Sequence, residues 1–360
     1  MFRPSWHLGL GLALLAASAA RAEDWPQFRG PQRDGICREK RVPLRWAPDR
    51  NIRWKAPLPG EGNSSPIVVG QQVYVTCATD AGARRGLYCF DRRSGDLAWR
   101  RIVEYSGDEP THQTNPYCGS SPAAAQGRVV VWHASAGVHC YDEQGQELWS
   151  RDLGAFRHIW GYGSSPLIAG DRVVLNCGPG PRQFVIALDL ASGQTLWQAD
   201  EPGGDAGEKP PGEDGAKPWT GSWTTPVLID VDGRSQVLVA LARHVKAFDP
   251  VSGELLWKCE GTGDLAYTDP LVGGGLGVAM GGYHGAAIGF RLGGSGDITD
   301  SGRLWRNDSR NPQRIGSGVL IDGYVYMANE IGLAQCLDAR TGAEIWRGRL
   351  PGPRIWSSII

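Results

Sequence analysis

Short runs rich in β-branched residues recur along the chain, and each run follows a turn that contains glycine. Gly70 precedes such a run at 73–75, and Gly127 precedes another at 129–131. Runs of this length bounded by turn-forming residues are typical of strands. The pattern predicts an all-β chain.

Two further elements give each run a fixed place in a larger unit. A Ser/Thr-Ser/Thr-Pro element opens an inner strand, as at 64–66 and 164–166. An Asp-x-x-Ser/Thr-Gly corner follows the third strand, as at 189–193, and leads into a strand that carries a tryptophan. We expect a tight turn at this corner, because Asp bonds nearby backbone amides and glycine accepts a positive φ. Each unit therefore has four strands.

The tryptophan returns at intervals of 41 to 60 residues, the period of a four-stranded propeller blade. The series comprises Trp54, Trp99, Trp149, Trp197, Trp257, Trp305 and Trp346. A flat side chain that buries about 150–250 Å² fills the gap where neighbouring blades splay apart. We predict that all seven are structural docking residues of a β-propeller.

Six blades are complete within residues 64–360, and a seventh is split between the two ends of the chain. Residues 23–63 supply a leader and the outer strand with Trp54, whereas the segment around Trp356 and Ser358 looks like an inner strand. We expect these two strands to lie side by side across a gap, in a propeller truncated at its C-terminus. The full product would then have seven or eight blades.

Charge and the first residues bear on partners and compartment. The 37 Lys and Arg nearly balance the 38 Asp and Glu, so nothing favours nucleic acid as a partner. Residues 1–22 have a positive start, an apolar run of about ten residues and a small-x-small end, typical of a cleavable secretory signal. With no lipid-attachment cysteine near that end and no membrane anchor, we expect a periplasmic or secreted monomer.

The eight cysteines leave two interpretations open. An even number in an exported chain is compatible with disulfides. Cys89, Cys140 and Cys336, however, share one repeat position that holds Ala187 and Ala247 in other copies, as a small buried side chain would. We favour free, packed thiols.

The repeat at 187–197 resembles the tryptophan-docking motif of pyrroloquinoline quinone (PQQ) repeat propellers. That family includes quinoprotein alcohol dehydrogenases and the outer-membrane assembly lipoprotein BamB. The segment 24–35, which begins Asp-Trp-Pro-Gln-Phe-Arg-Gly-Pro, is similar to the leader of exported, planctomycete-type members. The resemblance covers about residues 24–360 and implies the propeller fold. It leaves the function open, because the same blade serves enzymes and scaffolds.

For the enzymes of that family, the resemblance implies PQQ with Ca²⁺ on the propeller axis, an Asp base and a vicinal Cys-Cys disulfide. This chain has no Cys-Cys pair and no C-x-x-C-His haem site. Zinc spacings, G-x-S-x-G, Walker and H-E-x-x-H motifs do not occur either. We predict no catalytic residue, no metal and no cofactor, with PQQ and Ca²⁺ as the alternative.

In a propeller the segments just before the inner strands converge at one mouth of the central channel. Here they supply the candidate ligand-binding residues Arg157, Trp160, Tyr162, Trp219, Trp223, Tyr267, Arg314 and Arg354. Aromatic rings stack on flat or sugar-like ligands, and the arginines would favour an acidic one. The alternative is a water-filled channel with aromatic packing. Insertions at 104–117 and 200–217 lie at the same mouth, the second expected to be a flap or a linker.

The sequence therefore predicts a non-catalytic, exported β-propeller that acts as a binding or scaffold module for an envelope protein or a small polar ligand. The alternative function is that of a PQQ-dependent quinoprotein dehydrogenase. A carbohydrate-handling enzyme has only the aromatic mouth in its favour.

Overall fold

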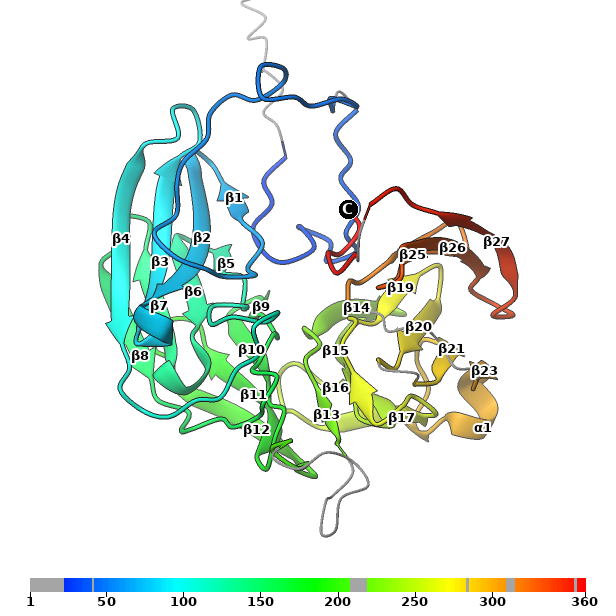
Figure 1. Cartoon of the computed structure of the whole chain (residues 1–360). Helices are drawn as coiled ribbons and strands as arrows, with labels where there is room; N and C mark the ends of the chain where they lie inside the picture. Colours follow the sequence, from blue (N-terminus) through cyan, green and yellow to red (C-terminus); the bar gives the residue numbers. More distant parts are fainter. Residues whose placement is uncertain (1–22, 41, 208–218, 283–284, 309–314, 353–354) are drawn as a thin grey trace, which may run out of the picture.

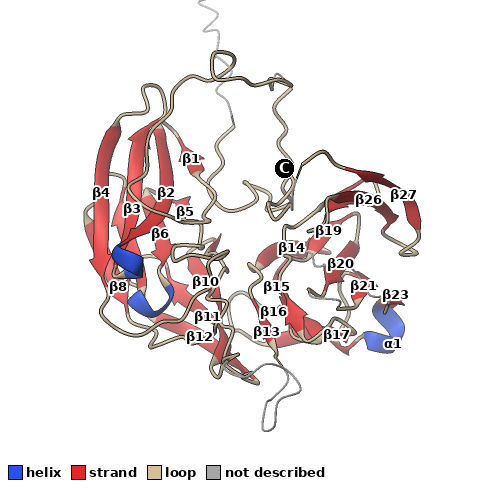
Figure 2. Cartoon of the chain, in the orientation of Figure 1, coloured by secondary structure: helices blue, strands red, loops and turns tan. Residues whose placement is uncertain are grey.

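The computed structural model describes residues 23–40, 42–207, 219–282, 285–308, 315–352 and 355–360. Within this part of the chain, six sheets of at least four strands stand side by side in a ring, which is open between the first sheet and the last (Figure 1). Almost every regular element is a strand (Figure 2). The predicted all-β propeller with six complete blades is confirmed.

Within each blade the strands follow the chain from the axis outward and pair antiparallel. The first three blades comprise β1 (Ile67–Val69), β2 (Gln72–Thr79), β3 (Arg84–Asp91) and β4 (Leu97–Glu104); β5 (Ala123–Ala125), β6 (Arg128–Trp132), β7 (Val138–Asp142) and β8 (Glu147–Arg151); and β9 (Leu167–Ala169), β10 (Arg172–Cys177), β11 (Gln183–Asp189) and β12 (Thr195–Glu201).

The other three blades repeat this arrangement. They comprise β14 (Val227–Val231), β15 (Arg234–Leu241), β16 (His244–Phe248) and β17 (Leu255–Glu260); β19 (Leu271–Gly273), β20 (Leu276–Met280), β21 (Ala287–Arg291) and β23 (Arg303–Asn307); and β24 (Val319–Ile321), β25 (Tyr324–Ala328), β26 (Leu333–Asp338) and β27 (Glu344–Arg349). The short elements outside this scheme are η1 (Asp80–Gly82), η2 (Ala134–Ala136), β13 (Gly221–Ser222), β18 (Leu265–Ala266), β22 (Gly296–Asp297) and α1 (Thr299–Gly302).

Docking tryptophans join each blade to the next through the glycine of the corner. The Nε1 of Trp149 donates a hydrogen bond to the carbonyl of Leu190 at 3.0 Å. Gly193 of that corner has φ +71°, and a Cβ on it would lie 2.6 Å from the Trp149 ring. Glycine is therefore needed twice, for its backbone conformation and for the approach of the ring. The same contacts join Trp54 to Gly95, Trp99 to Gly145, Trp197 to Gly253 and Trp305 to Gly342.

Two tryptophans of the series depart from this contact. The Nε1 of Trp257 donates to Oε1 of Gln236 at 2.7 Å, and the next corner carries Arg291 where the others carry Asp. Trp346 is 45% exposed, because no further sheet lies beside β27 in the described residues.

Trp197→Ala should lower the free energy of unfolding by about 3–5 kcal/mol, because it opens a cavity between two blades where the side chain is only 8% exposed. Trp346→Ala should cost about 1 kcal/mol or less, since that ring faces solvent. Urea unfolding of both variants measures the difference. Equal losses would contradict the assignment of stability to docking on the next corner.

A ring of hydrogen bonds runs from blade to blade at the start of the inner strands. The backbone amide of the second residue in each Ser/Thr pair donates to the side chain of its counterpart in the next blade. The pairs are Ser65 to Ser121, Ser121 to Ser165, Ser165 to Thr225, Thr225 to Asp269, Asp269 to Ser317 and Ser317 to Ser358, at 2.7 to 3.2 Å. We call this series the serine belt.

The split seventh blade is only partly formed. Ser358 extends the serine belt into the seventh position, and Trp54 docks on blade one. Neither 51–63 nor 355–360 forms a strand, however, so the expected pair of strands side by side is not present in the described residues. Within the described residues no strand lies between these segments, so their backbones have no ladder to join.

The leader runs into the middle of the ring, a placement that the sequence did not predict (Figure 1). It is hydrogen-bonded to four blades, through the pairs Trp25 with Val68, Pro26 with Ala124, Arg33 with Ile168 and Arg29 with Gly318. The leader therefore links blade one to blade six from the inside of the ring.

Two buried charges meet where the leader crosses the serine belt. Arg29 of the leader and Asp269 of the belt are each only 3% exposed. Burial raises the pKa of Asp269 to about 6, although the Arg29 charge and the amide of Thr225 act in the opposite direction. At this belt position the other described blades have an uncharged hydroxyl, so within the described residues Asp269 is the titratable member of the serine belt.

Asp269→Thr should remove a loss of folding stability that grows as the pH rises. The folded-state pKa of about 6 lies above the ordinary 3.8, so the folded protein binds the proton more readily and Asp269 costs stability as the pH rises. The unfolding free energy of the variant minus that of the wild type should therefore increase by about 2 kcal/mol between pH 4.5 and pH 7. Chemical denaturation at both pH values measures this difference, and a pH-independent difference would contradict it.

All eight cysteines are free thiols. Seven are buried and Cys37 is exposed. This agrees with the interpretation of the repeated cysteine position as a packing position.

Candidate functional site

Four rings from three different blade connections meet with a histidine on the loop face of the propeller. The ring of Trp160 lies 4.7 Å from Trp219 and 6.0 Å from Trp223, centroid to centroid, and Trp223 lies 5.0 Å from Tyr267. The imidazole of His158 packs edge-on against Trp223 at 5.0 Å. We call these five residues the aromatic cluster. Trp160, Trp219 and Tyr267 are partly exposed.

The backbone explains why these rings meet. The short strands β13 and β18 pair in parallel immediately before Trp223 and Tyr267, and the Trp223 amide donates to the carbonyl of Ala266 at 2.8 Å. The Nε1 of Trp223 then donates to the carbonyl of Gly161 at 2.9 Å, which ties in the loop that carries Trp160. The cluster is thus held by backbone contacts between three connections.

The other predicted site residues lie elsewhere. Tyr162 is buried and packs on Trp132 at 5.3 Å, in the core between blades two and three. Arg157 is exposed and pairs with Asp108 at 2.7 Å. Arg314 and Arg354 lie outside the described residues.

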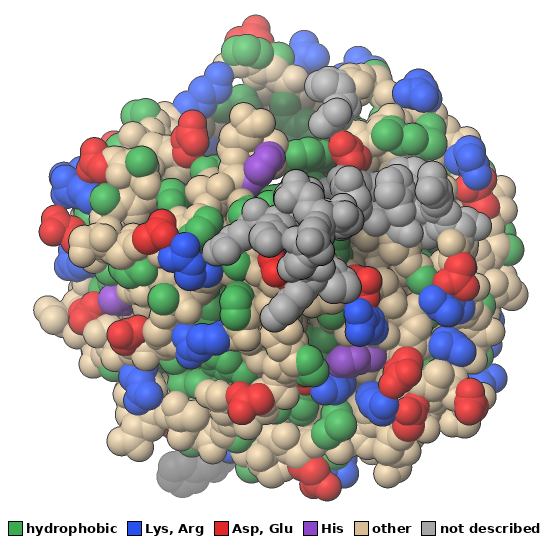
Figure 3. Space-filling view, turned by 60° about the horizontal axis from the view of Figure 1, so that its bottom comes forward, with side chains coloured by type: hydrophobic (Ala, Val, Ile, Leu, Met, Phe, Trp, Pro, Cys, Tyr) green, Lys and Arg blue, Asp and Glu red, His purple; other side chains and the backbone are tan. Residues whose placement is uncertain are grey.

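The charged side chains around the described residues of the mouth are of both signs. Of the three arginines expected to make it positive, Arg157 is the one the structure describes, and its charge is matched by Asp108. On the face turned forward in Figure 3, basic and acidic side chains are interspersed. This arrangement gives no support to the expectation of an acidic ligand.

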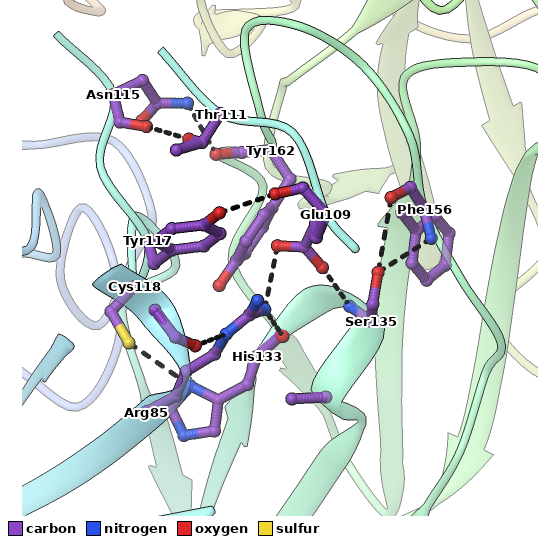
Figure 4. A network of polar contacts seen from close by, with 12 residues as sticks. Arg85, Glu109, Thr111, Asn115, Tyr117, Cys118, His133, Ser135, Phe156 and Tyr162 are labelled. Atoms are coloured by element: carbon purple, nitrogen blue, oxygen red, sulfur yellow. Dashed lines mark hydrogen bonds and ion pairs between the residues drawn. The ribbon is translucent and has the colours of Figure 1, made fainter. Parts of the chain in front are cut away.

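A buried ion pair that the sequence did not reveal lies beside the cluster (Figure 4). Arg85 donates to Oε1 of Glu109 at 2.8 Å and to the carbonyl of His133 at 2.6 Å. Its guanidinium lies between the rings of Tyr105 and Tyr117, 4.9 and 4.7 Å from their centroids. Arg85 and Glu109 are both almost fully buried.

This network fastens the insertion 104–117 to the propeller. The second carboxylate oxygen of Glu109 accepts from the Ser135 amide at 2.8 Å, and the Tyr117 hydroxyl donates to the Glu109 carbonyl at 2.6 Å. No sequence pattern predicts this pair, because an arginine in a strand and a glutamate in a polar loop are ordinarily solvated.

The buried thiol and imidazole beside this network are not a reactive pair. The Sγ of Cys118 lies 3.7 Å from Nδ1 of His133. Burial raises the pKa of Cys118 to about 12 and lowers that of His133 well below its ordinary value. Both groups are therefore neutral near pH 7, and the thiolate needed for nucleophilic chemistry is not formed.

A small hollow of about 10 Å³, partly open to solvent and with room for about one water molecule, lies between the ion pair and the aromatic cluster. Its lining residues are Glu109, Pro110, Phe156, Arg157, His158, Gly161, Tyr162, Gly178 and Pro179. The hollow joins the predicted mouth residues Arg157 and Tyr162 to the cluster through His158.

The residues of the axis do not fit a calcium-bound quinone. Calcium takes six to eight oxygen ligands. The serine belt presents one carboxylate, Asp269, and the buried positive charge of Arg29 acts on it and would repel a cation. Among the described residues no group of three or more His, Cys, Asp or Glu side chains is arranged to hold a metal ion.

No helix within the described residues is long and apolar enough to cross a membrane. The longest helical element there, α1, has four residues.

The four-stranded blades, the glycine corners and the docking tryptophans define a β-propeller of PQQ-like repeats. A family model described as outer membrane protein assembly factor BamB matches residues 83–215 and 294–355, more than half of the chain. The chain therefore belongs to this family.

Individual proteins are similar to this chain in structure or in sequence. BamB from Moraxella catarrhalis has a similar structure, with a TM-score of 0.52 and 18% sequence identity over 82% of this chain and 77% of that one. The quinohemoprotein alcohol dehydrogenase of Comamonas testosteroni aligns at a TM-score of 0.46 and 14% identity, over 95% of this chain and 75% of that one. In sequence, quinohemoprotein alcohol dehydrogenase ADH-IIG of Pseudomonas putida is 27% identical over 198 residues, 50% of this chain and 26% of that protein. The chain thus spans about a quarter of that relative's length.

Glu109→Ala should lower the free energy of unfolding by about 3–5 kcal/mol, because it leaves the buried charge of Arg85 uncompensated. Arg157→Ala, which breaks the exposed pair with Asp108 in the same insertion, is the control and should cost about 0–1 kcal/mol. Urea unfolding measures both, and limited proteolysis should cut within 104–117 in the first variant alone. Equal costs would show that the buried pair does not fasten the insertion.

Proposed function

We propose that the protein is a non-catalytic, exported binding or scaffold module that holds a small polar ligand or a segment of an envelope protein at the aromatic cluster. The observation that carries this proposal is the cluster itself. Three partly exposed rings, Trp160, Trp219 and Tyr267, are supported from below by buried Trp223 and His158. Preset aromatic surfaces of this kind gain contact area on binding at little cost in side-chain entropy.

The family relationship supports an envelope setting. The family description names an outer membrane assembly factor, a role that depends on protein partners. The signal-like segment 1–22, which lies outside the described residues, fits export to the periplasm or beyond.

The second candidate is a PQQ-dependent dehydrogenase, favoured by the 27% identity with a quinohemoprotein alcohol dehydrogenase. The buried Arg29 at the axis and the single carboxylate of Asp269 speak against it. Adding PQQ and Ca²⁺ to the purified protein tests this alternative. If quinone absorbance stays with the protein and a dye is reduced in the presence of alcohol, the protein is a dehydrogenase and not a non-catalytic binding module.

A thermal-shift screen with neutral sugars, acidic sugars, quinones and short peptides should find ligands that raise the melting temperature of the full chain. These shifts should disappear in Trp160→Ala, because this ring contacts all four other members of the cluster. Trp46→Ala, which removes a tryptophan that is exposed and far from the cluster in sequence, is the control and should keep them. Hits that survive in Trp160→Ala would place binding elsewhere and leave the cluster as packing.

A further inference from the structure

The leader carries a run of large apolar side chains that face water. Val42, Leu44 and Trp46 are 50%, 89% and 62% exposed. They alternate with Pro43 and Arg45, which is the pattern of a strand with one apolar face. The run nevertheless forms no strand. The leader that carries it crosses the open side of the ring, between blades one and six (Figure 1).

The position of this run along the chain corresponds to the third strand of the seventh blade. In three blades the third strand ends eight residues before the docking tryptophan, at Asp91, Asp189 and Asp338. Eight residues before Trp54 is Trp46, the last residue of the run. A turn already lies between the two, because the backbones of Ala47 and Arg50 donate to each other at 3.1 and 2.9 Å. The leader thus contains the start of a β-hairpin.

The register of this turn places the apolar run on the side away from blade one. Continuing the pairing of the turn brings Pro43 opposite Trp54. Opposite residues share a face of a hairpin and neighbours alternate, so Leu44 belongs to the other face. Trp54 docks on Gly95 of blade one. The apolar face of the hairpin therefore belongs to the side of blade six, where Trp346 is half exposed.

One strand position of the seventh blade is then left without a segment in the described residues. Ser358 occupies the inner position through the serine belt, and Trp54 occupies the outer one. The run 42–46 has the third position, and the second lies between it and 355–360. Neither neighbour is in a sheet, so both have backbone groups available to a strand placed between them. Extended segments of other proteins are recognised through such unpaired backbone edges.

The second strands of the other blades indicate which side chains fit this position. In β6 and β10, residues 129–132 and 173–176 are at most 1% exposed, although they alternate between the two faces of the sheet. A strand at this position therefore needs a continuous apolar run. The surroundings are basic. From 42 to 55 the charged side chains are one acidic residue and four exposed basic ones, namely Asp49, Arg45, Arg50, Arg53 and Lys55. Acidic residues at the ends of the run would match this charge.

We propose that the seventh-blade position binds an extended segment of a partner protein, an apolar strand with acidic residues at its ends. The segment pairs with 42–46 on one side and with 355–360 on the other. The apolar run of the leader then packs against the face of blade six that carries Trp346. The seventh blade is thereby held by the contacts that join the other blades, the docked tryptophan and the serine belt. This site is separate from the aromatic cluster, so the inference goes beyond the proposed function.

Fluorescence anisotropy of the full chain with a labelled peptide tests the strand pairing. The peptide carries residues 173–176 of β10 between two pairs of glutamates. It should bind, and Val174→Pro within the peptide should weaken binding by about tenfold or more, because proline cannot donate to a strand ladder. A lysine-flanked peptide should bind more weakly, and the difference should shrink at high salt. Equal binding of the proline peptide would overturn the proposal.

Hydrogen exchange of the complex locates the peptide. The amides of 42–46 and 355–360 should exchange about tenfold more slowly with peptide bound, because they enter a ladder, and those of 219–223 and 265–267 should not change. Protection of the latter two segments alone would place the peptide at the aromatic cluster and overturn the seventh-blade site.

Leu44→Asn is the variant that separates binding from folding. The side chain is 89% exposed, so the melting temperature of the unbound variant should stay that of the wild type. Peptide binding should weaken by about tenfold, because the amide would be buried against blade six without a partner. Leu196→Asn, on the outer strand β12 and 45% exposed, is the matched control and should bind as the wild type does.

Trp160→Ala should also bind the peptide as the wild type does, which distinguishes this site from the aromatic cluster. Absence of peptide binding, or equal binding by Leu44→Asn and Leu196→Asn, would overturn the proposal. Sedimentation of the chain alone adds a further check. A dimer that the peptide dissociates would make a second copy of this chain the occupant in place of a partner protein.

Discussion

The contact between a tryptophan of one blade and the corner glycine of the next is the interaction on which the ring depends. The corner glycine, with its positive φ, leaves room for the indole ring, and the residue after the corner Asp supplies the carbonyl that accepts the indole N–H, as Leu190 does for Trp149. Each repeat therefore specifies its own turn and the position of its neighbour. The angle between blades that results brings the connections before the inner strands together, and the aromatic cluster forms where three of these connections meet.

The features that could be predicted from the sequence are those that repeat. The spacing of the tryptophans, the corners and the Ser/Thr pairs each occur several times, so the blade count and the convergence of Trp160, Trp219, Trp223 and Tyr267 follow from one pattern. The features that could not be predicted occur once. The pairing of Arg85 with Glu109 and the meeting of Arg29 with Asp269 join segments whose proximity no local pattern encodes. Tyr162 belongs to neither group. Its position before an inner strand predicts a place at the mouth, but its ring packs on Trp132 in the core.

Buried charges mark the places where this propeller departs from an even ring. At position 269 an uncharged hydroxyl could accept the hydrogen bond of the serine belt, as it does in the other described blades. At position 109 the insertion does not require a buried charge. The Arg85–Glu109 ion pair selects one arrangement, because any other leaves a buried charge unpaired at a cost of several kcal/mol. Arg29 and Asp269 interact electrostatically without forming an ion pair. Arg29 fixes where the leader enters the ring, and Arg85 fixes where the insertion 104–117 lies. The shape of the hollow beside the cluster depends on the second of these, since Glu109 and Pro110 form part of its lining.

The leader also sets an order for folding. The hydrogen bond from Arg29 to the carbonyl of Gly318 joins residues 289 positions apart, whereas each blade is built from strands that follow one another directly. Contacts of large sequence separation carry the largest loop-closure cost and form late. The leader is synthesised before every blade and therefore reaches its final place only after the sixth blade has formed. The leader is therefore the last segment to pack against the blades. Until it does, the inner edges of blades one, two and three are open to water.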